Sequence, residues 1–385
     1  MIPVHYNIRS LMVRKVTTLA TAGGIALVVF VFAAAQMLGA GIERALGSAG
    51  RPDTVIILRN GSDAELSSGI NNDLLNLLTT RPEVAVDKGG VIGEVVVVVT
   101  AELRDGSGVS NVLVRGMPER GFAFRPEAKV ISGRAPVAGS NEVLVGKAIA
   151  GRFRGLATGE SFDLRRNRPL KVVGVFEAAG TSYESEVWGD LDVIRTSLGR
   201  SAAVSSARAR LTSPGQFEAF RASIESDKQL GMKVMREADY YRKQSAQTSG
   251  FLVGMGTAIA ILFALAAMIG AAITMNGAVA NRSREIGTLR ALGFTRRAIL
   301  SSFLLEAIAL ALLGGAVGVA LVMLMSLVKF PVLNFQTFSE IVISFRATPG
   351  VVISALVFSV VMGLIGGLIP AIRASRISPV EAMRA

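Results

Sequence analysis

The 385-residue sequence contains no cysteine and only one histidine, His5. Without cysteine the chain can form neither a disulfide nor a thiolate metal site, and it offers no thiol for lipoprotein-type lipid attachment. His5 lies in a short basic segment, where a metal-binding or catalytic role is not expected. Residues 43–249 contain no nucleophile–base pair and no metal-ligand pattern. The sequence therefore predicts a chain without a catalytic or metal site of its own.

A phosphate-binding loop is also missing. The pattern Gly-x-x-x-x-Gly-Lys-Ser/Thr, whose backbone amides cradle nucleotide phosphates, occurs nowhere in the chain. The nearest pair, Gly146-Lys147, is followed by Ala148. We therefore expect no cofactor on this chain and no ATP hydrolysis by this chain alone.

Charged residues are scarce at 18%, whereas 51% of residues are hydrophobic and the mean hydropathy is +0.49. A bilayer span takes about 20 mostly apolar residues. Four stretches meet that length, namely residues 16–42, 250–279, 298–328 and 347–372. The first is longer than the apolar core of about 7–15 residues in a cleavable signal peptide. It is therefore expected to remain as a first span.

Acidic residues are rare in three short segments outside these stretches. Residues 1–15, 280–297 and 373–385 carry eleven Lys and Arg residues against two Glu residues, which supplies most of the net charge of +12. Basic segments flanking spans stay in the cytoplasm. We therefore expect both termini and residues 280–297 to be cytoplasmic, and the positive charge to reflect membrane topology rather than nucleic-acid binding.

The long segment between the first two stretches has the composition of a folded domain. Short β-branched runs separated by Gly and Pro predict strands at 54–59, 91–103, 111–117, 142–145, 170–176, 203–211 and 232–235. Helices are expected at 70–80 and 214–228. Residues 237–248 are polar, lack Gly and Pro, and are expected to extend the second span as a stalk, with 41–46 as its counterpart on the first span.

The fold class expected is an α-helical membrane protein with four transmembrane helices in a one-plus-three layout. A large α+β extracytoplasmic domain lies between spans 1 and 2. The expected divisions are 1–15 (cytoplasmic interfacial helix), 16–42 (span 1), 43–249 (outer core domain with stalk helices), 250–279 (span 2), 280–297 (cytoplasmic coupling helix), 298–328 (span 3), 329–346 (short outer loop), 347–372 (span 4) and 373–385 (cytoplasmic tail).

Residues 280–297 have more order than a topology signal requires. Ile286, Leu289 and Leu292 recur on one helical face, as in a short amphipathic helix at a membrane surface. Gly293 suits the left-handed position that ends a helix, and Thr295 suits the cap of the next one. A plain basic loop would explain the arginines, but it would not need this phase or these end signals.

Two motifs in this region carry a family resemblance. Residues 284–294, Arg-Glu-Ile-Gly-Thr-Leu-Arg-Ala-Leu-Gly-Phe, resemble the signature of the FtsX-like, MacB-like permease domain of ABC transporters. Residues 370–384 are similar to that family's terminal pattern P-A-x-R-A-x-R-x-x-P-x-E-A-x-R. More loosely, residues 133–134, 142–146 and 171–176 resemble the family's periplasmic core domain.

The resemblance implies a coupling helix that docks on a separate ATPase subunit, which would bind ATP and Mg²⁺. The residues expected to form it are Arg284, Glu285, Ile286, Gly287, Leu289, Arg290, Leu292 and Gly293. Because the first span lies close to the start of the sequence, the chain resembles the split type without a fused ATPase. A non-catalytic permease in the bacterial inner (plasma) membrane is therefore expected.

The resemblance also implies partners and a mode of action. Two permease copies, as a homo- or heterodimer in the lipid bilayer, would pair with two ATPase subunits and, in some systems, with a periplasmic adaptor and an outer-membrane channel. ATP hydrolysis would move the outer domain by mechanotransmission, driving export or extraction of a lipid, lipoprotein, peptide or drug. The alternative is an FtsX-like signalling scaffold whose outer domain activates a cell-wall hydrolase.

Two features within the spans keep alternative readings open. Glu306 is expected to be an intramembrane carboxylate, which either has a transport or proton role, or snorkels or pairs within the bundle or the dimer. Gly-x-x-x-Gly pairs allow helices to approach closely, within one subunit or between two. They occur at 250/254, 314/318 and 363/367.

Overall fold

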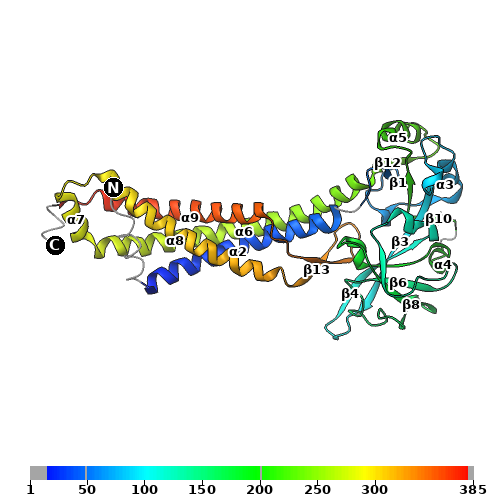
Figure 1. Cartoon of the computed structure of the whole chain (residues 1–385), viewed down its shortest axis with the longest axis horizontal. Helices are drawn as coiled ribbons and strands as arrows, with labels where there is room; N and C mark the ends of the chain where they lie inside the picture. The colour runs from blue at the N-terminus through cyan, green and yellow to red at the C-terminus, as the bar shows by residue number, and fades with distance from the viewer. Residues whose placement is uncertain (1–14, 48–49, 200–201, 380–385) are drawn as a thin grey trace. The chain divides into compact units, whose positions relative to one another are not determined.

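The computed structural model describes residues 15–47, 50–199 and 202–379 (Figure 1). The expected interfacial helix at 1–15, apart from its last residue, and the end of the expected tail at 380–385 lie outside the described residues. The chain divides into two compact units. We call residues 1–40, 251–328 and 344–385 the helical unit, and residues 41–250 and 329–343 the sheet unit.

Within the described residues, four long helices are apolar enough to cross a membrane. They are α2 Lys15–Gly47, α6 Glu237–Asn281, α8 Arg296–Met325 and α9 Pro349–Ser375. A short helix, α7 Ser283–Ala291, stands between α6 and α8. As expected, residues 237–248 belong to the same helix as the apolar run that follows, and residues 41–46 belong to α2.

The helical unit is packed through small residues. Side chains of α2, α6, α8 and α9 share one apolar cluster, which includes Val29, Ala260, Ala311 and Met362. A Cβ atom at Gly314 of α8 would lie 2.6 Å from a backbone oxygen of α2. The pairs 314/318 and 363/367 therefore serve close packing inside this unit, whereas a Cβ at 250 or 254 meets nothing within 4 Å.

The sheet unit contains most of the strands. In chain order they are β1 Thr54–Arg59, β2 Ile70–Asn71, β3 Val91–Glu102, β4 Val109–Met117, β5 Lys129–Gly133, β6 Glu142–Gly146, β7 Ser161–Arg165, β8 Arg168–Glu177, β9 Glu186–Asp190, β10 Ala203–Val204, β11 Ser206–Arg210, β12 Met232–Arg236, β13 Lys329–Leu333 and β14 Glu340–Ser344. Three helices accompany them, α3 Asn72–Thr79, α4 Leu191–Ser197 and α5 Phe217–Glu225. Short 3-10 turns are η1 Glu65–Ser67, η2 Val86–Lys88, η3 Glu119–Phe124, η4 Ser182–Ser185 and η5 Pro214–Gln216.

Ten strands form one mixed sheet in the order β12-β1-β11-β3-β4-β9-β6-β8-β5, with β7 also paired to β8. The β4–β9 and β6–β8 pairs are parallel, and the other pairs along the sheet are antiparallel. Val55, Val114, Val145 and Phe220 lie in its apolar core. The α+β class of this domain is thereby confirmed.

Several expected elements need correction. The run 203–211 is two strands, β10 and β11, separated by Ser205. The helix expected at 70–80 begins only at Asn72, because residues 70–71 pair with β10. The helix expected at 214–228 is shorter, because residues 214–216 form the turn η5 and α5 covers only Phe217–Glu225. The segment 329–346, expected to be a short loop, contains the two-stranded sheet β13–β14.

Candidate functional site

The start of α7 is fixed by a buried ion pair. Arg282, directly before α7, places Nη1 3.3 Å from Oε2 of Glu306 on α8 and Nε 3.3 Å from Oε2 of Glu285. Its guanidinium also lies 5.9 Å from the ring centre of Phe303. Glu306 thus forms an ion pair within the helical unit, which accounts for a buried carboxylate; a transport or proton role for it stays a hypothesis.

The end of α7 has the geometry expected from the sequence. Gly293 has a φ of 95°, and its N–H donates to the carbonyl of Arg290 at 3.2 Å. The N–H of Phe294 donates to the carbonyl of Leu289 at 3.1 Å, which completes a Schellman motif. Thr295 then caps α8, because its Oγ1 accepts a hydrogen bond from the N–H of Ala298 at 3.2 Å. Both the stop and the restart are confirmed.

One side of α7 packs on the helical unit. Ile286 and Gly287 are buried, and Leu289 and Arg290 are half-buried. Ile286 joins a cluster with residues of α6, α8 and α9, which include Met275, Phe303 and Ala371. The short helix is therefore held against the bundle along its length and pinned at both ends.

The other side of α7 is open. Arg284 and Glu285 are exposed, and so is Gly293. Leu292, expected on the apolar face of the helix, is 72% exposed. The helix ends at Ala291, and Leu292 is the C-cap residue, whose N–H still donates to the carbonyl of Thr288 at 2.9 Å. The exposed leucine beside charged side chains forms a small surface suited to contact with another protein.

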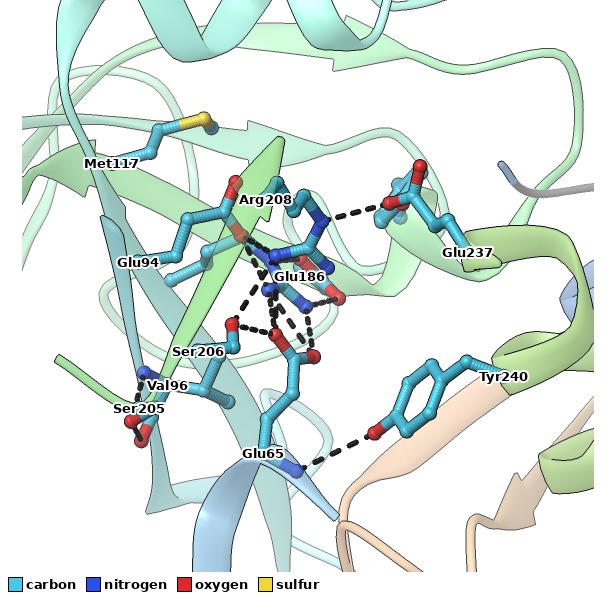
Figure 2. A network of polar contacts seen from close by, with 12 residues as sticks. Glu65, Glu94, Val96, Met117, Glu186, Ser205, Ser206, Arg208, Glu237 and Tyr240 are labelled. Atoms are coloured by element: carbon cyan, nitrogen blue, oxygen red, sulfur yellow. Dashed lines mark hydrogen bonds and ion pairs between the residues drawn. The ribbon is translucent and has the colours of Figure 1, made fainter. Parts of the chain in front are cut away.

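A second polar feature lies inside the sheet unit (Figure 2). Seven ionisable side chains form one buried set, which we call the arginine–glutamate cluster. Its members are Glu65, Glu94, Arg115, Arg125, Glu186, Arg208 and Glu237. Three positive and four negative groups leave one net negative charge in the interior.

Arg208 on β11 is the most connected member. Its Nε donates to Oε1 of Glu237 at 2.7 Å and its Nη1 lies 3.2 Å from Oε1 of Glu65. Nη1 also pairs with Oε2 of Glu94. Figure 2 shows Arg208 lying between Glu94 and Glu237. Because Arg208 and Glu94 are both 0% exposed, water does not screen their interaction.

Arg115 on β4 connects the other carboxylates. It reaches Oε2 of Glu186 with Nε at 2.8 Å, Oε2 of Glu94 with Nη1 at 2.8 Å, and Oε1 of Glu65 at 3.0 Å. Glu186 also accepts a hydrogen bond from Nε1 of Trp188 at 2.8 Å. The cluster therefore joins neighbouring strands across the middle of the sheet, β11, β3, β4 and β9.

Side chains from the first turns of α6 contact this cluster. Glu237 accepts from Arg208, and Tyr241 Oη accepts from Nη2 of Arg208 at 3.0 Å. Tyr240 Oη accepts from the backbone N–H of Glu65 at 3.4 Å. Residues 237, 240 and 241 share one helical face because they are spaced three and four apart. The cluster thus fixes the beginning of α6 to the sheet.

Charge interactions decide the protonation states of the cluster. Burial by itself raises the pKa of Glu94, but Arg125, Arg208 and Arg115 outweigh it and lower that pKa from 4.5 to about 2. Against the same burial, Arg115 and Arg208 hold the pKa of Glu65 well below 4.5. Burial raises the pKa of Tyr241 to about 12. Glu65 and Glu94 are therefore charged and Tyr241 is neutral at ordinary pH.

Sequence reasoning did not find this cluster. Its members are separated by up to 172 positions, and the strand-like runs give no sign that their arginines face inward. One signal was present in the sequence of β11, Ser-Ala-Arg-Ala-Arg, all five residues of which are buried in the structure. A strand with only alanine on its apolar face can bury little surface there, which hints that the arginine face is covered as well.

Comparison with known families decides the family of this chain. The model of the MacB-like periplasmic core domain matches residues 16–227, and the model of the FtsX-like permease C-terminal domain matches residues 257–379. The chain belongs to the MacB-like, FtsX-like family of ABC transporter permeases. As a member of that family with four apolar helices, this permease is a multi-pass membrane protein.

Individual relatives agree with this assignment. The macrolide export ATP-binding/permease protein MacB of Rhodospirillum rubrum is 31% identical over 275 residues, covering 67% of this chain and 39% of the relative. An uncharacterized ABC transporter permease of Bacillus subtilis, YvrN, is 42% identical over 106 residues, covering 28% of this chain and 24% of the relative. The chain thus spans well under half the length of these relatives.

A solved structure also resembles part of the permease. The periplasmic region of MacB from Actinobacillus actinomycetemcomitans covers 52% of this chain and 94% of that chain, with 13% identity and a TM-score of 0.38.

Proposed function

We propose that this permease couples ATP hydrolysis on a separate ATPase subunit to motion of its sheet unit, with α7 as the docking helix. The observation that carries the proposal is the construction of α7. The helix is pinned by the Arg282–Glu306 ion pair at its start and by the Schellman motif at its end. Such a short, fixed helix can pass a push from a partner to α6 and α8 without bending.

The exposed side of α7 supports a protein partner. Arg284 and Glu285 offer charges for specificity and orientation, and Leu292 offers an apolar anchor at the rim. ATP and Mg²⁺ would be held by the partner. Family membership implies such an ATPase and a dimer of permeases in general.

The membrane arrangement follows from charge. The basic segments next to the apolar helices favour cytoplasmic termini and a cytoplasmic α7, with α2, α6, α8 and α9 as spans in a one-plus-three layout. The sheet unit would then lie outside the cytoplasm of a bacterial inner membrane. There it would act by mechanotransmission on a lipid, lipoprotein, peptide or drug, with an adaptor and an outer-membrane channel where the cell has them.

The experiment is a surface change on α7 that leaves its packing intact. Arg284→Glu combined with Leu292→Asp alters two exposed side chains. We expect the variant to insert in the membrane, but to lose co-purification with the ATPase and stimulation of ATP hydrolysis. The control is Leu77→Asp on α3, an exposed leucine of the sheet unit that should leave both readouts unchanged. Normal co-purification and stimulation in the double variant would contradict the role of α7.

A further inference from the structure

The segment between α8 and α9 is built as a defined hairpin. Strands β13 and β14 pair with each other, and the turn between them is closed by the N–H of Phe338, which donates to the carbonyl of Asn334 at 2.7 Å. Oδ1 of Asn334 accepts a second hydrogen bond from the N–H of Gln336 at 3.0 Å. Residues 329–343 group with the sheet unit.

The hairpin sits on the sheet unit through polar contacts. The N–H of Val342 donates to Oγ of Ser185 at 3.0 Å, and Nδ2 of Asn111 donates to the carbonyl of Phe338 at 2.9 Å. Nε2 of Gln336 donates to Oε1 of Gln247 on α6 at 2.5 Å. An ion pair between Arg152 and Glu340 adds a fourth contact.

The hairpin covers one side of the arginine–glutamate cluster. A small polar cavity of about 20 Å³ separates them, lined on one side by Glu65, Arg115 and Glu186 and on the other by Asn334, Thr337 and Glu340. A cavity of about 10–15 Å³ is enough for one water molecule. Lifting the hairpin would admit bulk water to these charges and weaken their attraction, because the local dielectric constant would rise.

The polar composition of the contact between the hairpin and the rest of the sheet unit favours a reversible interaction. Four of its interactions are hydrogen bonds or ion pairs, and several of the groups involved are partly exposed. From the hairpin, the partly buried Val342 packs against the apolar core of the sheet unit. Contacts of this polar kind resemble transient interfaces, whereas permanent ones are more hydrophobic.

The hairpin is joined to α8 and α9 by short connections. Only three residues separate α8 from β13 and four separate β14 from α9, so displacement of either helix would pull on the hairpin.

We propose that the β13–β14 hairpin is a reversible clasp, seated over the arginine–glutamate cluster at rest and released when the transport cycle moves α8 and α9. This inference rests on the proposed function, since it requires an ATP-driven cycle. Seated, the hairpin keeps water from the charges that fix the start of α6. Released, it lets that junction loosen, so the state of α8 and α9 sets how firmly α6 is held.

The absence of cysteine from the chain allows a clean cross-linking test. In Ser185→Cys/Val342→Cys the two Cα atoms lie within about 7 Å, because a 3.0 Å hydrogen bond joins Oγ of Ser185 to the backbone nitrogen next to the Cα of Val342. In native membranes holding the full chain and its ATPase, we expect oxidation without nucleotide to form this disulfide readily. Addition of MgATP should slow its formation by roughly tenfold, within the usual range of coupling between sites.

The second readout is the stimulated ATP hydrolysis of the variant after the disulfide has formed, which we call the locked form. We expect the oxidised variant to lose most of its stimulated ATP hydrolysis and to regain it on reduction. The control Leu77→Cys/Val342→Cys should not cross-link, since Val342 lies on β14, and its partner strand β13 stands well apart from α3 within the sheet unit (Figure 1). Gln247→Cys/Gln336→Cys with a short bis-maleimide changes only partly or fully exposed residues, and should give the same nucleotide dependence if the Ser185 variant folds poorly.

Two results would overturn the clasp. Failure of both pairs to cross-link without nucleotide would show that the hairpin is not seated. Cross-linking at a rate independent of MgATP, with full activity in the locked form, would show that it is never released. An error in the proposed function would be seen separately, because the chain without any substitution would then neither co-purify with an ATPase nor stimulate one.

Discussion

Removing Arg208 should show how much the arginine–glutamate cluster contributes to the sheet unit. Arg208→Met keeps much of the side-chain volume but leaves Glu94, Glu65 and Glu237 without their shared partner. The net charge of the cluster falls from one negative charge to two. Breaking a buried ion pair by removing one partner costs about 3–5 kcal/mol. For a domain of this size each kcal/mol lowers Tm by about 2–4 °C, so we expect a fall of about 6–20 °C.

Intrinsic tryptophan fluorescence provides the assay. Trp188 is the single tryptophan, and its Nε1 donates to Glu186 within the cluster. Thermal unfolding of the full chain in detergent, followed by tryptophan fluorescence, therefore reports on this region. The matched control is Arg154→Met, which removes an arginine whose ion pair with Glu102 has side chains 62% and 64% exposed. An exposed pair contributes at most about 1 kcal/mol.

A double variant tests whether the net charge of the cluster causes the loss of stability. Arg208→Met/Glu237→Gln restores the net charge of the cluster to one negative charge. We expect it to be more stable than Arg208→Met by about 1–2 kcal/mol, a typical interaction energy for residues in one network. A fall in Tm for Arg208→Met no larger than that of Arg154→Met would refute the claim that the cluster acts as a buried unit.

Other predictions concern acid stability and local packing. Because the folded pKa of Glu94 is about 2 against an ordinary 4.5, and that of Glu65 is lowered too, their stabilisation should be complete above pH 4.5 and lost as pH falls toward 2, seen as a falling Tm of the tryptophan signal. Gly314→Ala should destabilise the helical unit by about 1–3 kcal/mol through overpacking, whereas Gly254→Ala, facing open space, should not, as measured by circular dichroism during heating in detergent. Thr295→Ala should remove the cap of α8 at a cost of about 1 kcal/mol, visible as faster amide hydrogen exchange at residues 296–298.

The local parts of the structure were predictable because their signals are short-range. The stop at Gly293 and the restart at Thr295 depend on backbone and side-chain groups within five residues. The apolar helices follow from uninterrupted composition, and the stalk residues 237–248 from the lack of any helix breaker. Such features need no knowledge of the partners that each segment meets in the folded chain.

The errors and omissions came from tertiary context. Leu292 shares the apolar phase of α7 with Ile286 and Leu289, but the neighbouring elements that bury Ile286 leave Leu292 exposed. The docking of the β13–β14 hairpin was not predicted, since its contacts with Asn111 and Ser185 join residues more than 150 positions apart. The ion pair of Glu306 could not be predicted from the sequence, because it depends on the position of Arg282 in the folded chain.

The polar character of the cluster has a physical reason connected with α6. Burial of apolar surface is non-directional, so a helix held only by apolar contacts can slide or rotate at small cost. Hydrogen bonds and ion pairs lose strength steeply when distance or angle changes. Glu237, Tyr240 and Tyr241 meet Arg208 and Glu65 from one helical face, which fixes both the rotation and the axial position of α6. Buried charges therefore hold α6 in a fixed register on the sheet, which a purely apolar contact would not do.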